Sequence, residues 1–144
     1  MQYSAIDHDY MVYVEKNEKI MDTLTKFCKE KEILNAQLSG IGAVKAIELG
    51  AYDLGNREYT RQYFDDAWEL VSYQGNVTLK EDKPFIHAHI TISNHDMNTR
   101  GGHLFGAKVA VVGEFFLRTV DNTVHRQLNN DVGLPTWCLL ERVE

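Results

Sequence analysis

The segment "PFIHAHITIS", residues 84–93, alternates between two kinds of side chain. Successive side chains of an extended strand point to opposite faces, so this alternation predicts a β-strand. The apolar face suits a hydrophobic core and consists of Ile86, Ala88, Ile90 and Ile92. The opposite face carries His87 and His89. The segment therefore predicts a strand of a β-sheet. It also predicts that two histidines lie side by side on the face opposite the apolar one.

Extended patterns occupy most of the chain after residue 33. A Gly-Ile-Gly break at residues 40–42 interrupts the first of them, and residues 94–102 are expected to form a loop because they are polar and end in two glycines. The expected strands lie at residues 9–16, 33–53, 57–64, 67–79, 84–93, 107–120, 123–129 and 136–143.

One stretch, residues 18–31, has helical periodicity instead. Its apolar stripe consists of Ile20, Met21, Leu24, Phe27 and Cys28. Asn17 precedes the stripe and is expected to cap the helix. The sequence therefore predicts a single α+β domain over residues 1–144, with a largely antiparallel, curled sheet and one main helix against it.

The segment "AKVAVVGEFFL", residues 107–117, is apolar on both faces of its expected strand. Val109, Val111, Phe115 and Leu117 are expected on one face, and Ala110, Val112 and Phe116 on the other. A strand of this kind is covered on both sides. One helix can cover one side of the sheet, so a second subunit is expected on the other, and the alternative is a closed barrel.

The net charge of the chain is −6, with a charged fraction of 25% and no cluster of basic residues. Long-range repulsion from phosphate therefore disfavours non-specific binding to nucleic acid. The two cysteines, Cys28 and Cys138, have no motif spacing, so neither a disulfide framework nor a cysteine zinc site is indicated. No signal peptide or transmembrane segment is visible in the sequence, and we expect a cytoplasmic protein without a membrane partner.

His87, His89 and His103 are the candidate metal ligands. Histidines two apart on a strand point to the same side and can converge on one ion. Gly101 and Gly102 would allow the backbone to approach closely and bring in His103. Three imidazoles would leave a fourth position open, as in catalytic zinc sites. The alternative is that these histidines only form hydrogen bonds with neighbouring backbone groups, and the spacing alone favours that alternative.

Glu69 and Glu114 lie inside apolar strands, where a carboxylate needs a partner. Each could ligate the metal, accept a hydrogen bond from a ligating imidazole, or pair with an arginine. The alternative for either one is a position that faces solvent. The sequence contains no nucleophile motif, phosphate loop or dinucleotide fingerprint, so it identifies no catalytic residue. A protein that is not an enzyme is therefore favoured.

Four segments together resemble a known family: "LSGIGAVKAIELGAYD", "WELVSYQGNVT", "PFIHAHITIS" and "GGHLFGAKVAVVGEFFL". In order and spacing they are similar to the plants-and-prokaryotes conserved domain, the PPC domain. The resemblance runs from about Tyr10 to Leu117, and its most specific part is the His-x-His strand followed by Gly-Gly-His.

The resemblance implies an α/β domain with an antiparallel sheet that assembles as a homotrimer. It implies a zinc site at His87, His89 and His103, and the DNA-binding role commonly assigned to prokaryotic members. The chain departs from the family's pattern in two respects. It has no AT-hook core, and its "NHDMNTR" loop places Arg100 where an apolar residue is common.

Two functions remain open at this point. The first is a trimeric regulatory module with a three-histidine metal site, associated with DNA directly or through a DNA-associated protein partner. The second is a metal-dependent enzyme or a small-molecule-binding protein of unknown substrate.

Overall fold

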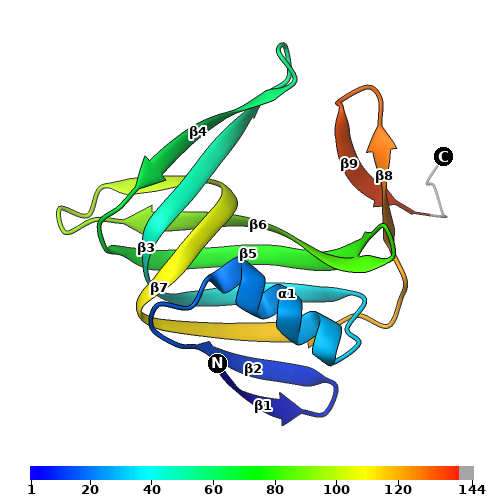
Figure 1. Ribbon diagram of the computed structural model, residues 1–144, viewed down its shortest axis with the longest axis horizontal. Helices are drawn as coiled ribbons and strands as arrows, with labels where there is room; N and C mark the ends of the chain where they lie inside the picture. The colour runs from blue at the N-terminus through cyan, green and yellow to red at the C-terminus, as the bar shows by residue number, and fades with distance from the viewer. Residues whose placement is uncertain (140–144) are drawn as a thin grey trace.

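Two long strands, β3 (Ala36–Asp53) and β7 (Thr99–Thr119), organise the sheet (Figure 1). The structure is a computed structural model that describes residues 1–139. The other elements are β1 (Gln2–Ile6), β2 (Asp9–Val14), α1 (Ile20–Glu30), β4 (Glu58–Phe64), β5 (Trp68–Lys80), β6 (Lys83–Ser93), β8 (His125–Asn129) and β9 (Leu134–Cys138).

The nine strands of residues 1–139 form one sheet that curls until it closes on itself. β3 pairs with β5, β5 with β6, β6 with β7, and β7 returns to β3, so these four strands make a ring. β2 extends the sheet beyond β7 and β4 extends it beyond β3. Every pairing is antiparallel except a single parallel contact between Leu79 of β5 and His125 of β8. The expected curled, largely antiparallel sheet with one helix is confirmed.

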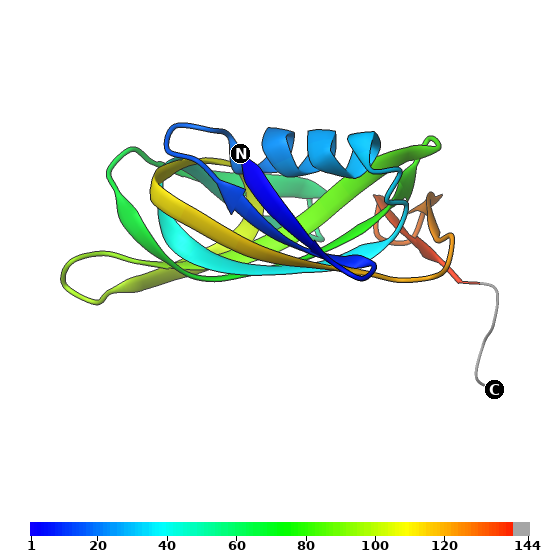
Figure 2. The same ribbon diagram turned by 90° about the horizontal axis from the view of Figure 1, so that it is seen from below.

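Helix α1 lies across one face of the sheet (Figure 2). It buries Ile20, Leu24, Phe27 and Cys28, the stripe that the periodicity predicts except for Met21, which is partly buried. The same core cluster contains residues from several strands, among them Val12, Val14, Leu38, Ile90, Ile92, Phe115 and Leu117. Because burial of each large aliphatic or aromatic side chain contributes about 1.5–3 kcal/mol, this shared core fixes the helix to the sheet.

Asn17 does not cap the helix. Lys19 is the N-cap residue, and its side chain makes no capping hydrogen bond. Asn17 instead adopts a left-handed backbone conformation, with φ of 71°, and its N–H donates to the carbonyl oxygen of Val109 at 2.9 Å. An asparagine tolerates this conformation well, so the residue forms a turn that ties the start of the helix to β7.

Several predicted boundaries are wrong. β3 runs through Gly40 and Gly42 with a bulge between them instead of breaking, because both neighbouring strands continue past this point. β7 begins at Thr99 and includes half of the expected loop. β1 was not predicted, and its burial pattern shows why: all five residues are exposed, so no apolar face marks it. The last residues of the expected strand at 136–143 lie outside the described part of the chain.

Strand β7 is irregular between Val109 and Gly113, where it has two more residues than the opposite segment of β3. Val111 lies within this irregular segment and is 63% exposed. Val109 before the segment and Phe115 after it are buried, as simple alternation predicts. Phe116 is 57% exposed, on the side of the sheet away from α1.

Within residues 1–139, no helix has the length and apolar character needed to span a bilayer.

Candidate metal centre

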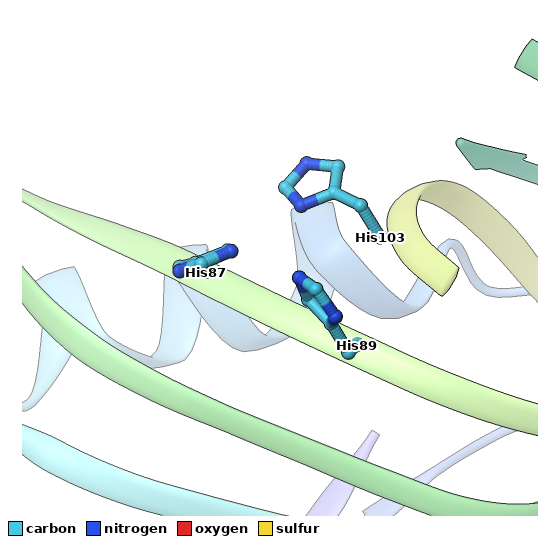
Figure 3. Close-up of side chains that lie close together, drawn as sticks. All are labelled: His87, His89 and His103. Atoms are coloured by element: carbon cyan, nitrogen blue, oxygen red, sulfur yellow. The ribbon is translucent and has the colours of Figure 1, made fainter. Parts of the chain in front are cut away.

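The three predicted histidines come together on two neighbouring strands. His87 and His89 project from the same side of β6, and His103 of β7 stands directly opposite His89 in the β6–β7 register. Figure 3 shows the three side chains pointing toward one another. Their ring centroids are 5.1 Å apart for His87 and His89, 5.1 Å for His87 and His103, and 5.4 Å for His89 and His103.

His103 is also the residue where β7 changes partners. It pairs with His89 of β6 on one side and with Gly50 of β3 on the other. Gly102 lies beside this junction, and a Cβ atom on it would come within 2.7 Å of the carbonyl oxygen of Gly50. A side chain cannot be accommodated there without moving one of the strands, so the glycine sets how closely the histidine strand approaches β3. The expected role of this glycine in a close approach is confirmed.

Burial keeps His87 and His103 neutral. Desolvation lowers the pKa of His103 to about 4, with smaller contributions from His87, His89 and Arg61. Desolvation also lowers the pKa of His87, assisted by the charge of Arg126 and by His89. Both imidazoles are therefore deprotonated at neutral pH, which is the form that binds metal ions. Protons compete only weakly with a metal for His103, even in mildly acidic solution.

One ring nitrogen of the cluster is left without a partner. His103 Nδ1 is buried and makes no hydrogen bond within the described residues. Buried polar atoms are rarely left in this state, because losing hydration without a replacement bond costs about 1–3 kcal/mol. A ligand that is not a protein group would satisfy this nitrogen.

The cluster fits a metal ion. One nitrogen from each histidine can be chosen so that all three lie within 4.8 Å of one another. Tetrahedral zinc, with Zn–N bonds of about 2.0–2.1 Å, separates its ligands by about 3.4 Å, so modest rotations of the side chains would complete the site. No carboxylate or thiolate joins the group within residues 1–139.

Aromatic side chains pack against one side of the cluster. The ring of Tyr59 on β4 lies 5.0 Å from that of His103, and the ring of Phe105 lies 4.7 Å from it. The guanidinium carbon of Arg61 lies 3.6 Å from the centroid of the Phe105 ring, and Arg61 forms an ion pair with Glu48 at 3.1 Å. These contacts restrict the orientation of the His103 ring and account for much of its desolvation.

Two hairpins project from the same side of the sheet (Figure 1), and side chains of the first form hydrogen bonds with the turn of the second. One consists of β3 and β4, and the other of β8 and β9. The Tyr52 hydroxyl of the first donates to the carbonyl oxygen of Val132 in the second at 2.7 Å, and Arg57 donates to the carbonyl oxygen of Asp131 at 3.4 Å. The histidine strand β6 crosses the sheet below this contact.

Glu69 and Glu114 lie elsewhere. Both side chains are exposed and line a shallow hollow together with Ile41, Val71 and Val111. None of the three histidines lines this hollow. The structure thus brings together the three histidines and leaves both glutamates apart from them.

Sequence reasoning did not identify Arg126 or Arg61 as part of this region. Arg126 lies in β8, a short strand with no apolar alternation, and Arg61 lies in β4, whose residues are mostly exposed. The signal that could have indicated this side of the site is the aromatic residue Tyr59, two positions before Arg61.

Residues 1–121 match the family model of the Plants and Prokaryotes Conserved (PCC) domain. No curated protein matches the sequence. A "putative DNA binding protein" from Bacteroides thetaiotaomicron has a similar structure, with a TM-score of 0.92 and 29% identity over 95% of this chain and 96% of that chain.

Two archaeal structures are also similar. A plant- and prokaryote-conserved protein from Pyrococcus horikoshii has a TM-score of 0.87 and 31% identity over 98% of this chain and 97% of that chain. A metal-containing protein from Archaeoglobus fulgidus has a TM-score of 0.86 and 28% identity over 96% of this chain and 99% of that chain.

Fold and site together define a small α+β protein with a ring-closed antiparallel sheet and three converging histidines. The chain belongs to the Plants and Prokaryotes Conserved domain family, as the resemblance of its four segments predicts.

Replacing Gly102 by alanine tests how the site is positioned. We expect Gly102→Ala to lower the free energy of unfolding by about 1–3 kcal/mol, because the new methyl group would collide with the Gly50 carbonyl. Urea denaturation measures the loss. Gly106→Ala on the same strand is the matched control, since a Cβ there meets nothing within 4 Å. Equal stability of the two variants would contradict the close approach.

Proposed function

We propose that this protein is a zinc-binding module in which His87, His89 and His103 hold the ion and leave one coordination position open. The convergence of three imidazole nitrogens within 4.8 Å of one another carries the proposal. The name of the Archaeoglobus fulgidus relative, a metal-containing protein, supports it.

The donor set favours zinc and other transition metals over magnesium and calcium. Imidazole suits zinc, copper, iron and nickel, whereas magnesium and calcium prefer oxygen ligands, which the cluster lacks within the described residues. Three protein ligands with one open position are typical of zinc sites that bind water or a substrate. A zinc ion held there would supply Lewis acidity, either to a bound water or to a carbonyl group.

The chain's own residues would shape what reaches this position. Tyr59 and Phe105 pack on one side of His103, which excludes water there and orients the ring. The β8–β9 hairpin brings Arg126 to the neighbourhood of His87. The site therefore fits a small-molecule binder or a metal-dependent enzyme as the second candidate function, and we assign no reaction to it.

Elemental analysis tests the metal site directly. We expect untagged protein dialysed against zinc to retain about one zinc ion per chain, and His87→Ala, His89→Ala and His103→Ala each to weaken zinc binding by at least about a hundredfold. Removing a residue that hydrogen-bonds to a metal ligand typically weakens metal affinity 10–100-fold, and removing the ligand itself should weaken it at least as much. His95→Ala, in the exposed loop after β6, is the control and should bind normally. Unchanged zinc content in all variants would refute the proposal.

We further propose that the protein is a homotrimer. The face of the sheet away from α1 carries an outer patch of exposed apolar side chains, namely Met11, Tyr13, Ile41, Val71, Val111 and Phe116. Met11 lies beside Phe116 in the β2–β7 register, so the patch crosses from β2 to β7. Glu69 and Glu114 lie among its members. Contiguous patches of this kind usually mark an interface, and the family resemblance implies three copies.

A charge placed in the outer patch should dissociate the assembly. We expect wild-type protein to have three times the chain mass of 16.5 kDa in light scattering. Phe116→Asp should shift this mass toward that of the monomer, because a carboxylate would lose hydration in an apolar interface. Leu54→Asp, at an equally exposed position in the β3–β4 turn, should leave the mass unchanged. A wild-type protein of monomeric mass would refute the trimer.

Association with DNA is the other role we propose, through a DNA-associated partner protein instead of direct contact. The name given to the Bacteroides thetaiotaomicron relative supports a link to DNA. The net charge of −6 and the lack of an AT-hook core oppose direct binding, because affinity for the phosphate backbone depends on neutralising cations.

Fluorescence anisotropy with a labelled random-sequence duplex tests this role. At 150 mM salt we expect no binding at micromolar protein concentration. Binding whose affinity falls steeply as salt is raised would instead demonstrate direct contact with the phosphates. Wild-type protein saturated with zinc is the form to use, so that a metal-dependent DNA site is included.

A further inference from the structure

We propose that the ligand filling the open side of the histidine site is a small carboxylate, and that Arg126 is the residue that binds its charge. This inference rests on the proposed zinc site. It adds a ligand class and a specificity residue that lies on a different part of the chain from the three histidines.

Arg126 is fixed in place by three neutral acceptors. Its Nε donates to the Thr78 hydroxyl at 2.8 Å, its Nη2 to the Asn76 side-chain oxygen at 2.8 Å, and its Nη1 to the carbonyl oxygen of Pro135 at 3.1 Å. Thr78 and Asn76 belong to β5, and Pro135 belongs to β9. The guanidinium group is thus held between the sheet and the C-terminal hairpin without relying on another charge.

No carboxylate neutralises Arg126 within residues 1–139. The groups around it are neutral or positive. The Arg126 guanidinium carbon lies 5.4 Å from the centroid of the Phe85 ring, and the Lys80 Nζ lies 5.3 Å from the same centroid. Asp82, the acidic residue that reaches the same hairpin, instead pairs with His125 at 3.6 Å. Arg61 provides the contrast, because Glu48 neutralises it at 3.1 Å.

Arg126 also lies within electrostatic reach of the histidines. Asn76, which accepts from its Nη2, stands opposite His87 in the β5–β6 register. The charge of Arg126 contributes to lowering the pKa of His87, and burial lowers the pKa of Arg126 itself. A half-buried cation without a counter-charge is costly, and an anion bound beside it would offset that cost.

The donors left over match a carboxylate. A guanidinium group has five N–H donors, and the three hydrogen bonds leave one N–H on each terminal nitrogen. Two such donors can bind the two oxygens of one carboxylate, and bonds of this charged type are about twice as strong as neutral ones. The site would then combine a metal ion for one end of the ligand with a fixed positive charge for the other.

Calorimetric titration of the zinc-loaded protein with glycolate tests the inference. We expect wild-type protein to bind glycolate at least tenfold more tightly than uncharged glycolamide. We expect Arg126→Gln to weaken glycolate binding by about tenfold to a hundredfold, the range expected for a charge-assisted hydrogen bond. Arg118→Gln is the control, because Arg118 is already paired with Asp9 at 3.9 Å and lies near the opposite end of β7 from His103, and it should weaken binding less than threefold.

Measuring the zinc content and thermal stability of each protein distinguishes failure of the proposed zinc site from failure of the proposed carboxylate ligand. If wild-type protein holds no zinc, the proposed function fails and this inference fails with it. If zinc is held but glycolate binds no better than glycolamide, or equally well to Arg126→Gln, the inference alone is overturned. Should Arg126→Gln fail to fold, Arg126→Lys keeps the charge but not the paired donors, and affinity equal to that of wild type would overturn the paired contact.

Discussion

The rest of the structure depends on the change of partner that β7 makes at His103. The strand pairs with β6 before this residue and with β3 after it, and His103 pairs with both. This switch closes the ring of four strands, buries the isoleucine face of β6 under α1, and places His103 opposite His89. Ring closure and site formation are therefore one event, and a change that separates β7 from β3 affects the core and the histidines together.

The site also shows how an acidic protein creates a locally positive region. The chain carries a net charge of −6, yet the surroundings of the histidines include Arg61, Lys80 and Arg126. Only one of these, Arg61, pairs with a carboxylate among the described residues. Local arrangement, and not overall charge, thus determines which ligands the site attracts, because interactions between charges beyond about 8–10 Å are largely screened.

The sequence predicted those features that depend on local pattern. Alternation in β6 identified its buried face, and spacing paired His87 with His89, both of which the structure confirms. Spacing alone could not place His103, because its position depends on the pairing of two strands; the preceding glycine pair suggested it and the family resemblance supported it. Alternation failed at Val111, because β7 has two more residues than β3 at this point and the extra segment turns Val111 outward. Arg126 was missed because its neighbours, Asn76 and Pro135, are contributed by distant strands.

Arg126 has one further consequence, which concerns how this family can diversify. The family model ends at residue 121, so it includes all three histidines but not the β8–β9 hairpin. The proposed metal ligands and the proposed carboxylate-binding arginine are thus encoded in separate stretches of the chain. A relative that kept the three histidines but changed the terminal hairpin would, on these proposals, keep the metal centre and select a different ligand. Membership of the family would then not imply a common ligand.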